Sequence, residues 1–323
     1  MHESRPLASL SLDLDNQWSY MKTHGDADWE SLPSYLDIVV PRVLRLLKER
    51  NLTITFFIVG LDADQERNHN VLRSIAEAGH EIGNHSFHHE PWLHLYSQEQ
   101  LVIEIAKAEA SIEQATGRKP IGFRGPGFSL SSDLIELLTH RGYLYDASTF
   151  PTYLGPLARA YYFMKSRLSE DDLKERKNLF GSFSDGLRST KAYCWRTAAG
   201  ELIEIPVTTM PGLKLPIHVS YLLYLSDFSS ALALAYFRTA LEVCRRTGTQ
   251  PSLLLHPLDF LGCDDTTALS FFPAMQLRSP VKVRFVNRVL DLFQEHFRIV
   301  PMERHAKHLS DLNLSRVAPR FNR

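Results

Sequence analysis

The sequence predicts an α/β fold in which parallel strands alternate with helices. Apolar or alternating segments at residues 6–15, 52–60 and 81–84 are separated by stretches that carry the apolar stripe of an amphipathic helix. This succession is typical of a parallel sheet with right-handed crossovers. The composition agrees, because 44% of the 323 residues are hydrophobic and 23% are charged, as in ordinary globular proteins. We predict a single domain over residues 1–323.

The first strand, residues 6–15, ends in two aspartates. Leucine alternates there with serine or aspartate, so Asp13 and Asp15 leave the same face at the same end, about 7 Å apart. Two such carboxylates can divide the work of binding a metal and handling a proton. The alternative is a solvated loop start in which aspartate is a turn residue.

A histidine-rich segment accompanies the strand at 81–84. Residues 80–89 contain four histidines, and His85 and His89 stand four positions apart. In a helix this spacing would place both rings on one face, and a strand that runs into His85 would present the same pair at its C-terminal end. Either arrangement indicates a metal site. The alternative interpretation is that these histidines are scattered over the surface and bind no metal.

The remaining elements follow from the same patterns. Helices are predicted at residues 35–50, 68–78, 98–116, 132–141 and 280–295. Further strands are predicted at residues 121–124, 143–146, 252–256 and 298–300, and a hairpin is formed by residues 194–196 and 202–207.

Polar side chains stand at the ends of several predicted strands. They are Asp13, Asp15, His85, Arg124, Asp146 and His256. In a barrel of parallel strands the carboxyl ends converge on one mouth, where the active sites of βα barrels are built. We therefore expect these side chains to lie together.

Three regions do not follow the alternation of strands and helices. Residues 149–199 are predicted as an insertion over the barrel mouth, with an exposed charged helix at 169–177. Residues 211–247 form an apolar helical segment, either partly buried or a surface for a lipid-linked substrate or the membrane interface. Residues 301–323 are predicted as a C-terminal helix and tail.

Charge and cysteine content narrow the class of protein. The net charge is −1 at pH 7, without a dominant basic run, so we expect no nucleic-acid partner. Cys194, Cys244 and Cys263 lack C-x-x-C spacing, which disfavours a disulfide framework or a cysteine-based zinc site. The N-terminus does not resemble a signal peptide, and no apolar run reaches about 18 residues. We expect a cytoplasmic protein without a transmembrane helix.

Five motifs, in this order and spacing, resemble those of the polysaccharide deacetylase family, also described as the NodB homology domain or carbohydrate esterase family 4. They are SLDLD (11–15), TFFIVG (55–60), GHEIGNHSFHH (79–89), FRGPG (123–127) and LLHP (254–257). The resemblance implies a distorted (β/α) barrel of NodB type with about seven parallel strands.

The resemblance also implies a metal centre. Asp15, His85 and His89 would bind a divalent ion, with zinc suited to two nitrogens and one oxygen, and cobalt or nickel as alternatives. Two imidazoles and one carboxylate leave positions open for water and an amide oxygen.

Further roles are implied around that centre. Asp13 would be the general base, held ionised and oriented by Arg124, and His256 the general acid. The backbone amide of Gly127, after Pro126, would help to stabilise an oxyanion.

The sequence departs from the family pattern in two places. Leu14 separates the two aspartates that are adjacent in many secreted members, which resembles the branch with cytoplasmic amidohydrolases and enzymes of cell-surface glycan assembly. Gly127 stands where many members carry an aromatic residue. Trp18 and Trp92 either supply the missing substrate-stacking ring or pack structurally, and Asp146 either orients a catalytic partner or caps a turn.

We therefore expect a metal-dependent amide hydrolase that removes N-acetyl groups from an N-acetylated sugar of a surface polysaccharide or its lipid-linked precursor. One alternative is a cytoplasmic hydrolase of a small cyclic amide or a formamido sugar, similar to an allantoinase or a deformylase. A mononuclear iron oxygenase and a non-catalytic glycan-binding relative are others. The sequence predicts no oligomeric state.

Overall fold

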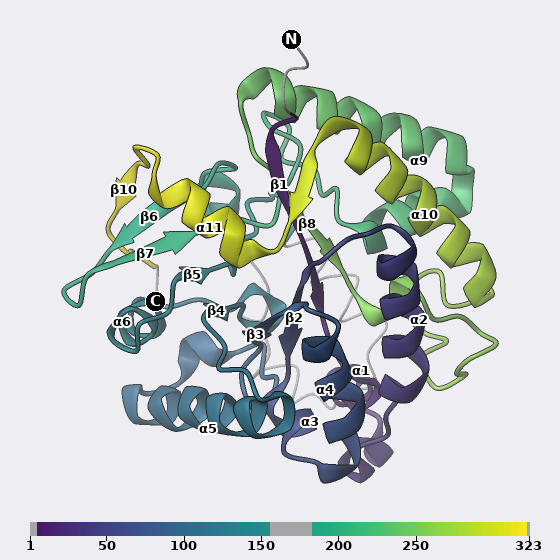
Figure 1. Cartoon of the computed structure of the whole chain (residues 1–323), viewed down its shortest axis with the longest axis horizontal. Coiled ribbons are helices and arrows are strands. Elements are labelled where there is room, and N and C mark those ends of the chain that lie inside the picture. The colour runs from purple at the N-terminus through teal and green to yellow at the C-terminus, as the bar shows by residue number, and fades with distance from the viewer. Residues whose placement is uncertain (1–4, 156–182, 322–323) are drawn as a thin grey trace.

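The computed structural model describes residues 5–155 and 183–321, and its centre is a sheet of parallel strands (Figure 1). Seven strands run parallel in the order β8-β1-β2-β3-β4-β5-β7. They are β1 (Leu7–Asp13), β2 (Thr55–Ile58), β3 (Glu81–Asn84), β4 (Gly122–Phe123), β5 (Tyr145–Asp146), β7 (Glu201–Glu204) and β8 (Ser252–Leu255). The predicted barrel-type architecture of about seven parallel strands is confirmed.

Three further strands extend this sheet. β6 (Tyr193–Arg196) pairs antiparallel with β7, as the predicted hairpin requires. β10 (Arg316–Val317) adds to β6, and β9 (Arg298–Val300) pairs with β1. Among the described residues no strand pairing closes the sheet into a ring. After β7, the backbone of Thr208 donates to Ser252 O of β8 at 3.1 Å. This contact is not part of a strand pairing, so the barrel is distorted and not continuously hydrogen-bonded.

The helices lie along the outside of the strands (Figure 1). Those at the predicted positions are α2 (Leu36–Glu49), α4 (His69–Glu77), α5 (Gln98–Thr116), α6 (Ser132–His140) and α10 (Ser279–His296). Also present are α1 (Gln17–His24), α3 (Gly60–Ala63), α9 (Val219–Thr247) and α11 (Met302–Ser310). Sequence signals set their ends: α5 begins with a capping box at Ser97 and ends at Gly117 in the left-handed conformation.

α11 closes the end of the barrel at which the strands begin. Met302 N donates to Thr55 Oγ1 at 2.8 Å, and Glu303 N donates to Glu81 Oε2 at 2.8 Å. Thr55 and Glu81 are the first residues of β2 and β3. A site built on the barrel must therefore open at the carboxyl ends of the strands.

Two predicted regions can be followed only in part. Most of the predicted insertion at 149–199, including the charged run at 169–177, lies outside the described residues, and its last part contains β6. In the region 211–247, α9 is kinked at Ser229 and packs one side into the core, while Phe228 and Leu232 are 77% and 72% exposed.

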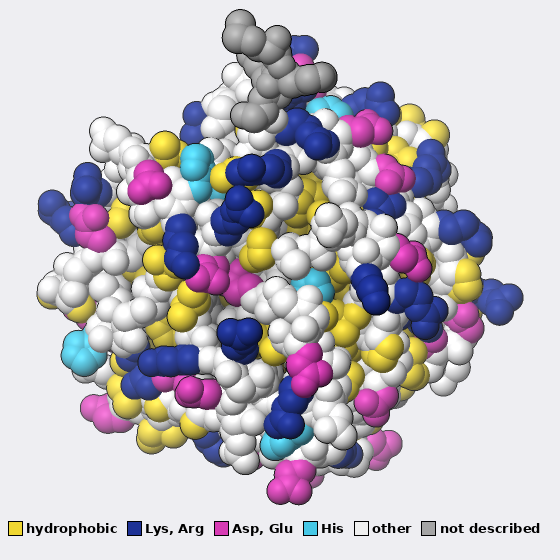
Figure 2. All heavy atoms as spheres, viewed as in Figure 1, with side chains coloured by type: hydrophobic (Ala, Val, Ile, Leu, Met, Phe, Trp, Pro, Cys, Tyr) yellow, Lys and Arg dark blue, Asp and Glu magenta, His cyan; other side chains and the backbone are white. Residues whose placement is uncertain are grey.

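The surface mixes side chains of different character. Basic, acidic and hydrophobic side chains are interspersed over the face in Figure 2. Within the described ranges, no helix is both long and apolar enough to cross a membrane.

Candidate active site

The loop after β3 brings two histidines together without a helix. Residues 85–89 are irregular, and Ser86 and His89 have positive φ angles of 62° and 55°, a conformation that is uncommon for residues other than glycine. Local hydrogen bonds hold it: Asn84 Oδ1 accepts from Ser86 N at 2.8 Å, and Ser86 Oγ accepts from His89 N at 3.1 Å. Of the two arrangements considered for this pair, the structure has the strand that runs into His85.

A buried glutamate from α5 supports the same loop. Glu104 accepts hydrogen bonds from the backbone N–H groups of Phe87 and His88 at 2.9 and 2.7 Å, and its other oxygen pairs with His88 Nδ1 at 2.7 Å. Burial raises the pKa of Glu104, but these bonds and the His88 ring outweigh it and leave the pKa below its ordinary value. The ionised carboxylate thus fixes the loop from outside the site.

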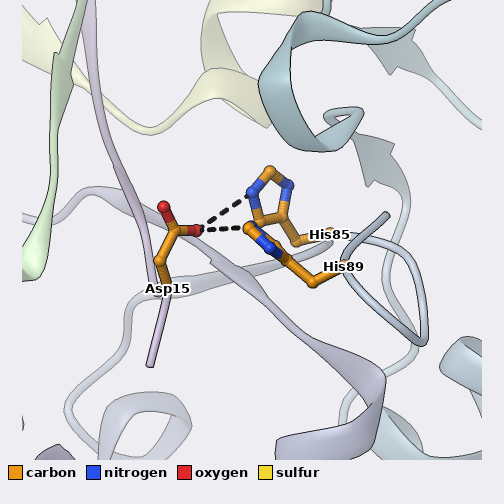
Figure 3. A group of neighbouring side chains, drawn as sticks. All are labelled: Asp15, His85 and His89. Carbon is orange, nitrogen blue, oxygen red and sulfur yellow. Dashed lines mark hydrogen bonds and ion pairs between the residues drawn. The ribbon is translucent and has the colours of Figure 1, made fainter. Parts of the chain in front are cut away.

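Asp15, His85 and His89 form a compact group of metal-type ligands (Figure 3). The Nε2 atoms of His85 and His89 lie 3.2 and 3.0 Å from Asp15 Oδ1, and one donor atom from each residue falls within 4.8 Å of the others. His85 Nδ1 donates to Arg124 O at 2.7 Å, so Nε2 is the ring nitrogen that faces the group. This donor set, two imidazole nitrogens and one carboxylate oxygen, fits a divalent metal such as zinc.

The electrostatics of this group are those of a buried charge cluster. Burial alone would raise the pKa of Asp15, but the charge of His89 and the hydrogen bonds from both imidazoles hold that pKa well below its ordinary value. Burial lowers the pKa of His85, whereas Asp13 and Asp15 raise it, with a net rise. The two carboxylates therefore act on one imidazole, as expected if both face the same site.

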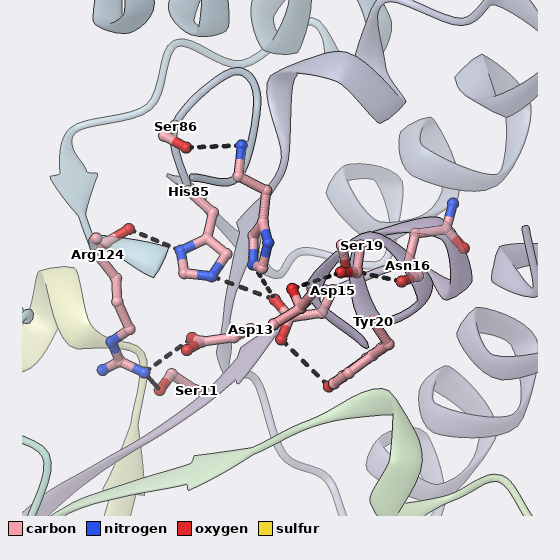
Figure 4. Close-up of polar contacts among 12 residues, drawn as sticks. Ser11, Asp13, Asp15, Asn16, Ser19, Tyr20, His85, Ser86 and Arg124 are labelled. Carbon is pink, nitrogen blue, oxygen red and sulfur yellow. Dashed lines mark hydrogen bonds and ion pairs between the residues drawn. The ribbon is translucent and has the colours of Figure 1, made fainter. Parts of the chain in front are cut away.

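Asp13 is paired with a buried arginine (Figure 4). Arg124 Nη1 donates to Asp13 Oδ1 at 2.9 Å and to Ser11 Oγ at 3.0 Å, and its Nε donates to Ala147 O at 3.0 Å. The side chains of Arg124 and Asp13 are 0% and 5% exposed. The guanidinium also lies over the Phe57 ring, 4.6 Å from its centroid. The arginine therefore has one orientation, and it presents the Asp13 carboxylate to the site.

The turn after Arg124 has a backbone conformation that requires its two glycines. Gly127 has a φ of 56°, and a Cβ on Gly125 would lie 2.2 Å from Ser129 O. Pro126 is buried and Gly127 is exposed. Ser148 Oγ accepts from Gly125 N at 2.8 Å and so anchors the turn.

Asp146 lies beneath that turn. It accepts from Ser148 Oγ at 2.6 Å and is fully buried beside Glu204. Burial and the adjacent Asp146 hold the pKa of Glu204 well above its ordinary value, and burial also raises the pKa of Asp146. The two roles considered for Asp146 are orienting a catalytic partner and capping a turn, and its bond to Ser148, which anchors the turn at Gly125, fits the second.

His256 follows β8 and is fixed by two residues that sequence reasoning missed. Ser220 Oγ lies 3.0 Å from His256 Nδ1 and donates to Asp259 Oδ1 at 2.7 Å. Burial raises the pKa of Tyr20, and the charges of Asp15 and Asp259 raise it further. Tyr20 OH donates to Asp15 Oδ2 at 3.2 Å, so this phenol lies between the metal-type group and the surroundings of His256.

Trp18 is not the substrate-stacking ring that was one of its two interpretations. It is fully buried, donates from Nε1 to Asp62 Oδ1 at 2.9 Å, and lies edge-on to His89 with 6.4 Å between ring centroids. Trp18 packs against His89 instead. Trp92 is half-buried, next to Pro91 after the histidine loop.

Other aromatic side chains line the approach to His256. Phe128 lies 4.7 Å from Phe150, Phe150 lies 5.6 Å from His218, and His218 lies 6.2 Å from His256, all between ring centroids. Phe128 directly follows Gly127, which stands where many members of the resembled family carry an aromatic residue.

Known proteins resemble part of the sequence of this chain, and solved structures resemble its fold. Residues 30–145 match the family described as polysaccharide deacetylase, and this segment contains His85, His89 and Arg124. A peptidoglycan deacetylase of Helicobacter pylori is 27% identical over 148 residues, which are 44% of this chain and 49% of that protein. A peptidoglycan-N-acetylglucosamine deacetylase of Bacillus cereus is 30% identical over 104 residues, or 32% of this chain and 37% of that protein. The chain thus spans about half or less of these relatives.

Solved structures extend the likeness in fold to the whole chain. A Mycobacterium smegmatis protein assigned to the polysaccharide deacetylases has a TM-score of 0.65 at 20% identity, covering 100% of this chain and 96% of its own. An allantoinase has a TM-score of 0.59 at 17% identity, covering 97% of this chain and 92% of its own. The sequence match over residues 30–145 and this common fold confirm the resemblance of the chain to the polysaccharide deacetylase family.

Proposed function

We propose that the chain is a metal-dependent hydrolase that removes acetyl groups from an N-acetylated carbohydrate. The observation that carries the proposal is the convergence, at one end of the barrel, of three metal-type ligands and a second carboxylate paired with a buried arginine. The names of the relatives support N-acetylglucosamine in a glycan, such as peptidoglycan, as the substrate class. A lipid-linked precursor of such a glycan is a narrower choice of substrate within the same proposal.

Each residue of the site has a role that its contacts permit. Asp15, His85 and His89 would hold the metal, which when bound would polarise the amide carbonyl and acidify water. Asp13 accepts the proton of the attacking water, and Arg124 keeps its carboxylate oriented.

The leaving group and the developing negative charge need two further groups. His256 gives a proton to the departing amine, because a free amide anion is too poor a leaving group at neutral pH. The exposed backbone of the turn at Gly127 offers an amide donor for the oxyanion. The row of Phe128 and Phe150 supplies an apolar wall for the sugar or its acetyl methyl group.

The test combines metal content with acetate release. Purified protein is assayed for bound metal and offered N-acetylated oligosaccharides and lipid-linked sugars in the presence of zinc, cobalt or nickel. We expect about one metal per chain, lost in His85→Ala, and acetate release that Asp13→Asn abolishes while metal stays bound. Arg246→Met, in an exposed ion pair with Glu242, is the matched control and should retain both.

The alternatives give different results in the same assay. Bound metal without acetate, but with turnover of a cyclic amide or a formamido sugar, would move the substrate to that class. Glycan binding without turnover would indicate a non-catalytic relative, and oxygen consumption would indicate an oxygenase. A chain that binds no metal would refute the mechanism.

A further inference from the structure

The ring of His256 is tied through Nδ1 to a serine and a buried carboxylate. Ser220 belongs to the first turn of α9, whereas Asp259 lies three residues after His256 in the segment that follows β8. Ser220 Oγ lies 3.0 Å from His256 Nδ1 and 2.7 Å from Asp259 Oδ1. The other oxygen of Asp259 accepts the backbone N–H of His256 at 2.8 Å. Asp259 is 1% exposed, whereas Ser220 and His256 are half-buried.

The direction of these hydrogen bonds determines the protonation of the imidazole. A serine hydroxyl has one proton, and Ser220 uses it to donate a hydrogen bond to the carboxylate of Asp259. Its oxygen can then only accept a hydrogen bond, and the donor is the N–H at His256 Nδ1. The neutral ring therefore carries its proton on Nδ1, and Nε2 is the nitrogen that gains and loses a proton during a reaction.

We propose that Ser220 and Asp259 are positioning residues that fix the tautomer and orientation of His256, so that its Nε2 protonates the departing amine. This inference rests on the proposed role of His256 as the acid. In that step the C–N bond of the substrate breaks and its electron pair takes the proton from Nε2. The ring is left neutral with its remaining proton on Nδ1, hydrogen-bonded to Ser220.

The groups packed around this chain of three residues are compatible with it. Lys282 from α10 is 1% exposed, and its positive charge and that of His256 both favour the ionised form of Asp259 against the burial that raises the pKa of this carboxyl. Burial and the charge of His256 lower the pKa of His218 to about 3, so this neighbouring ring is neutral. Tyr20, between Asp15 and Asp259, is held in its neutral form because its pKa is raised well above the ordinary value.

The tautomer can be measured without turnover. Long-range ¹H–¹⁵N spectra of the full chain, zinc-loaded and labelled in histidine, report which ring nitrogen carries the proton, and His256→Gln assigns the signals. We expect wild-type His256 to be protonated on Nδ1 at alkaline pH, and Ser220→Ala to give a mixture of both tautomers. Ser220→Thr keeps a hydroxyl and should restore the wild-type spectrum. Ser226→Ala, which removes a hydroxyl bonded to Leu223 O in the same helix, should change nothing.

Leaving-group dependence separates positioning from general structural damage. Ser220→Ala and Asp259→Asn should lower kcat for acetate release from an N-acetylated sugar by about 10- to 100-fold, with KM within about twofold. Hydrolysis of 4-nitrophenyl acetate should change less than about twofold, because 4-nitrophenolate departs without a proton. A purely structural role would depress both reactions together. If Asp259→Asn does not fold, Ser220→Ala carries the test alone.

The possible outcomes distinguish this inference from the proposed function. An unchanged tautomer in Ser220→Ala, or equal losses on the amide and the activated ester, would overturn the inference. A wild-type protein that releases no acetate would overturn the proposed function instead, and the spectra would still decide whether Ser220 sets the tautomer of His256.

Discussion

The buried pair of Asp13 and Arg124 makes a quantitative prediction about stability. Both charges are almost fully removed from water, and each is the principal charged partner of the other. Breaking a buried ion pair by removing one partner costs about 3–5 kcal/mol, since the other charge stays buried without compensation. Arg124→Met retains most of the side-chain volume, so we expect that loss of unfolding free energy with little contribution from a cavity.

The complementary changes complete a double-mutant cycle. Asp13→Asn leaves the Arg124 charge buried without its partner but keeps the shape and one hydrogen bond, so we expect it to cost about 3 kcal/mol, the lower end of that range. The combined variant contains neither charge and should be more stable than the sum of the single losses by about 2 kcal/mol. Urea unfolding of the metal-free proteins, followed by tryptophan fluorescence and circular dichroism, gives the four free energies.

A variant of an exposed ion pair is the control for the double-mutant cycle, and additive losses of stability would refute the reasoning. Arg246→Met removes one partner of a pair whose arginine side chain is 77% exposed, and it should change stability by at most about 0.5 kcal/mol. If the losses at Asp13 and Arg124 add to within about 0.5 kcal/mol, the two charges are not coupled. The orienting role given to the arginine would then be wrong.

Three further predictions concern metal, pH and the histidine loop. Zinc at about 1,000 times its Kd should stabilise the wild type by about 4 kcal/mol, seen as a rise in Tm that His85→Ala abolishes. Burial lowers the pKa of Lys282 from 10.5 to about 8, so the folded protein binds fewer protons than the unfolded chain between these pH values and its stability rises with pH there. Lys282→Met should therefore stabilise by up to about 3 kcal/mol at pH 7 and by much less near pH 10, measured by urea unfolding; an equal gain at both pH values would contradict this reasoning. Glu104→Gln should lower metal affinity about tenfold in chelator competition, because the loop between β3 and α5 loses its charged anchor, and an unchanged affinity would show that the loop needs no such anchor.

Sequence patterns carried most of the information about the strands and helices. The apolar stripe of α2 and the continuous apolar run of β2 each report the burial of their own residues, which is a local property. The convergence of strand ends then placed Asp13, His85 and Arg124 together, since parallel strands share one carboxyl edge.

The parts that sequence reasoning did not reach depend on contacts between distant segments. Glu104 looked like one more charged residue of an amphipathic helix, although it holds the histidine loop. The burial of Trp18 depends on Asp62, 44 positions away, and Ser220 meets His256 only because α9 begins beside the end of β8. None of these pairings has a periodic signature, so a single sequence contains no signal for them.

The spacing of the two aspartates by Leu14 has a structural consequence that explains their different neighbours. β1 ends at Asp13, which stays within the barrel, where Arg124 reaches it from the end of β4, although β2 and β3 lie between these two strands in the sheet. Asp15 lies beyond the last paired residue, in the connection to α1, and there its carboxylate reaches both imidazoles. A carboxylate held by a guanidinium can keep a free oxygen for a proton, whereas one held between two imidazoles completes a ligand set. The roles proposed for Asp13 as base and Asp15 as metal ligand therefore agree with the end of β1 at Asp13.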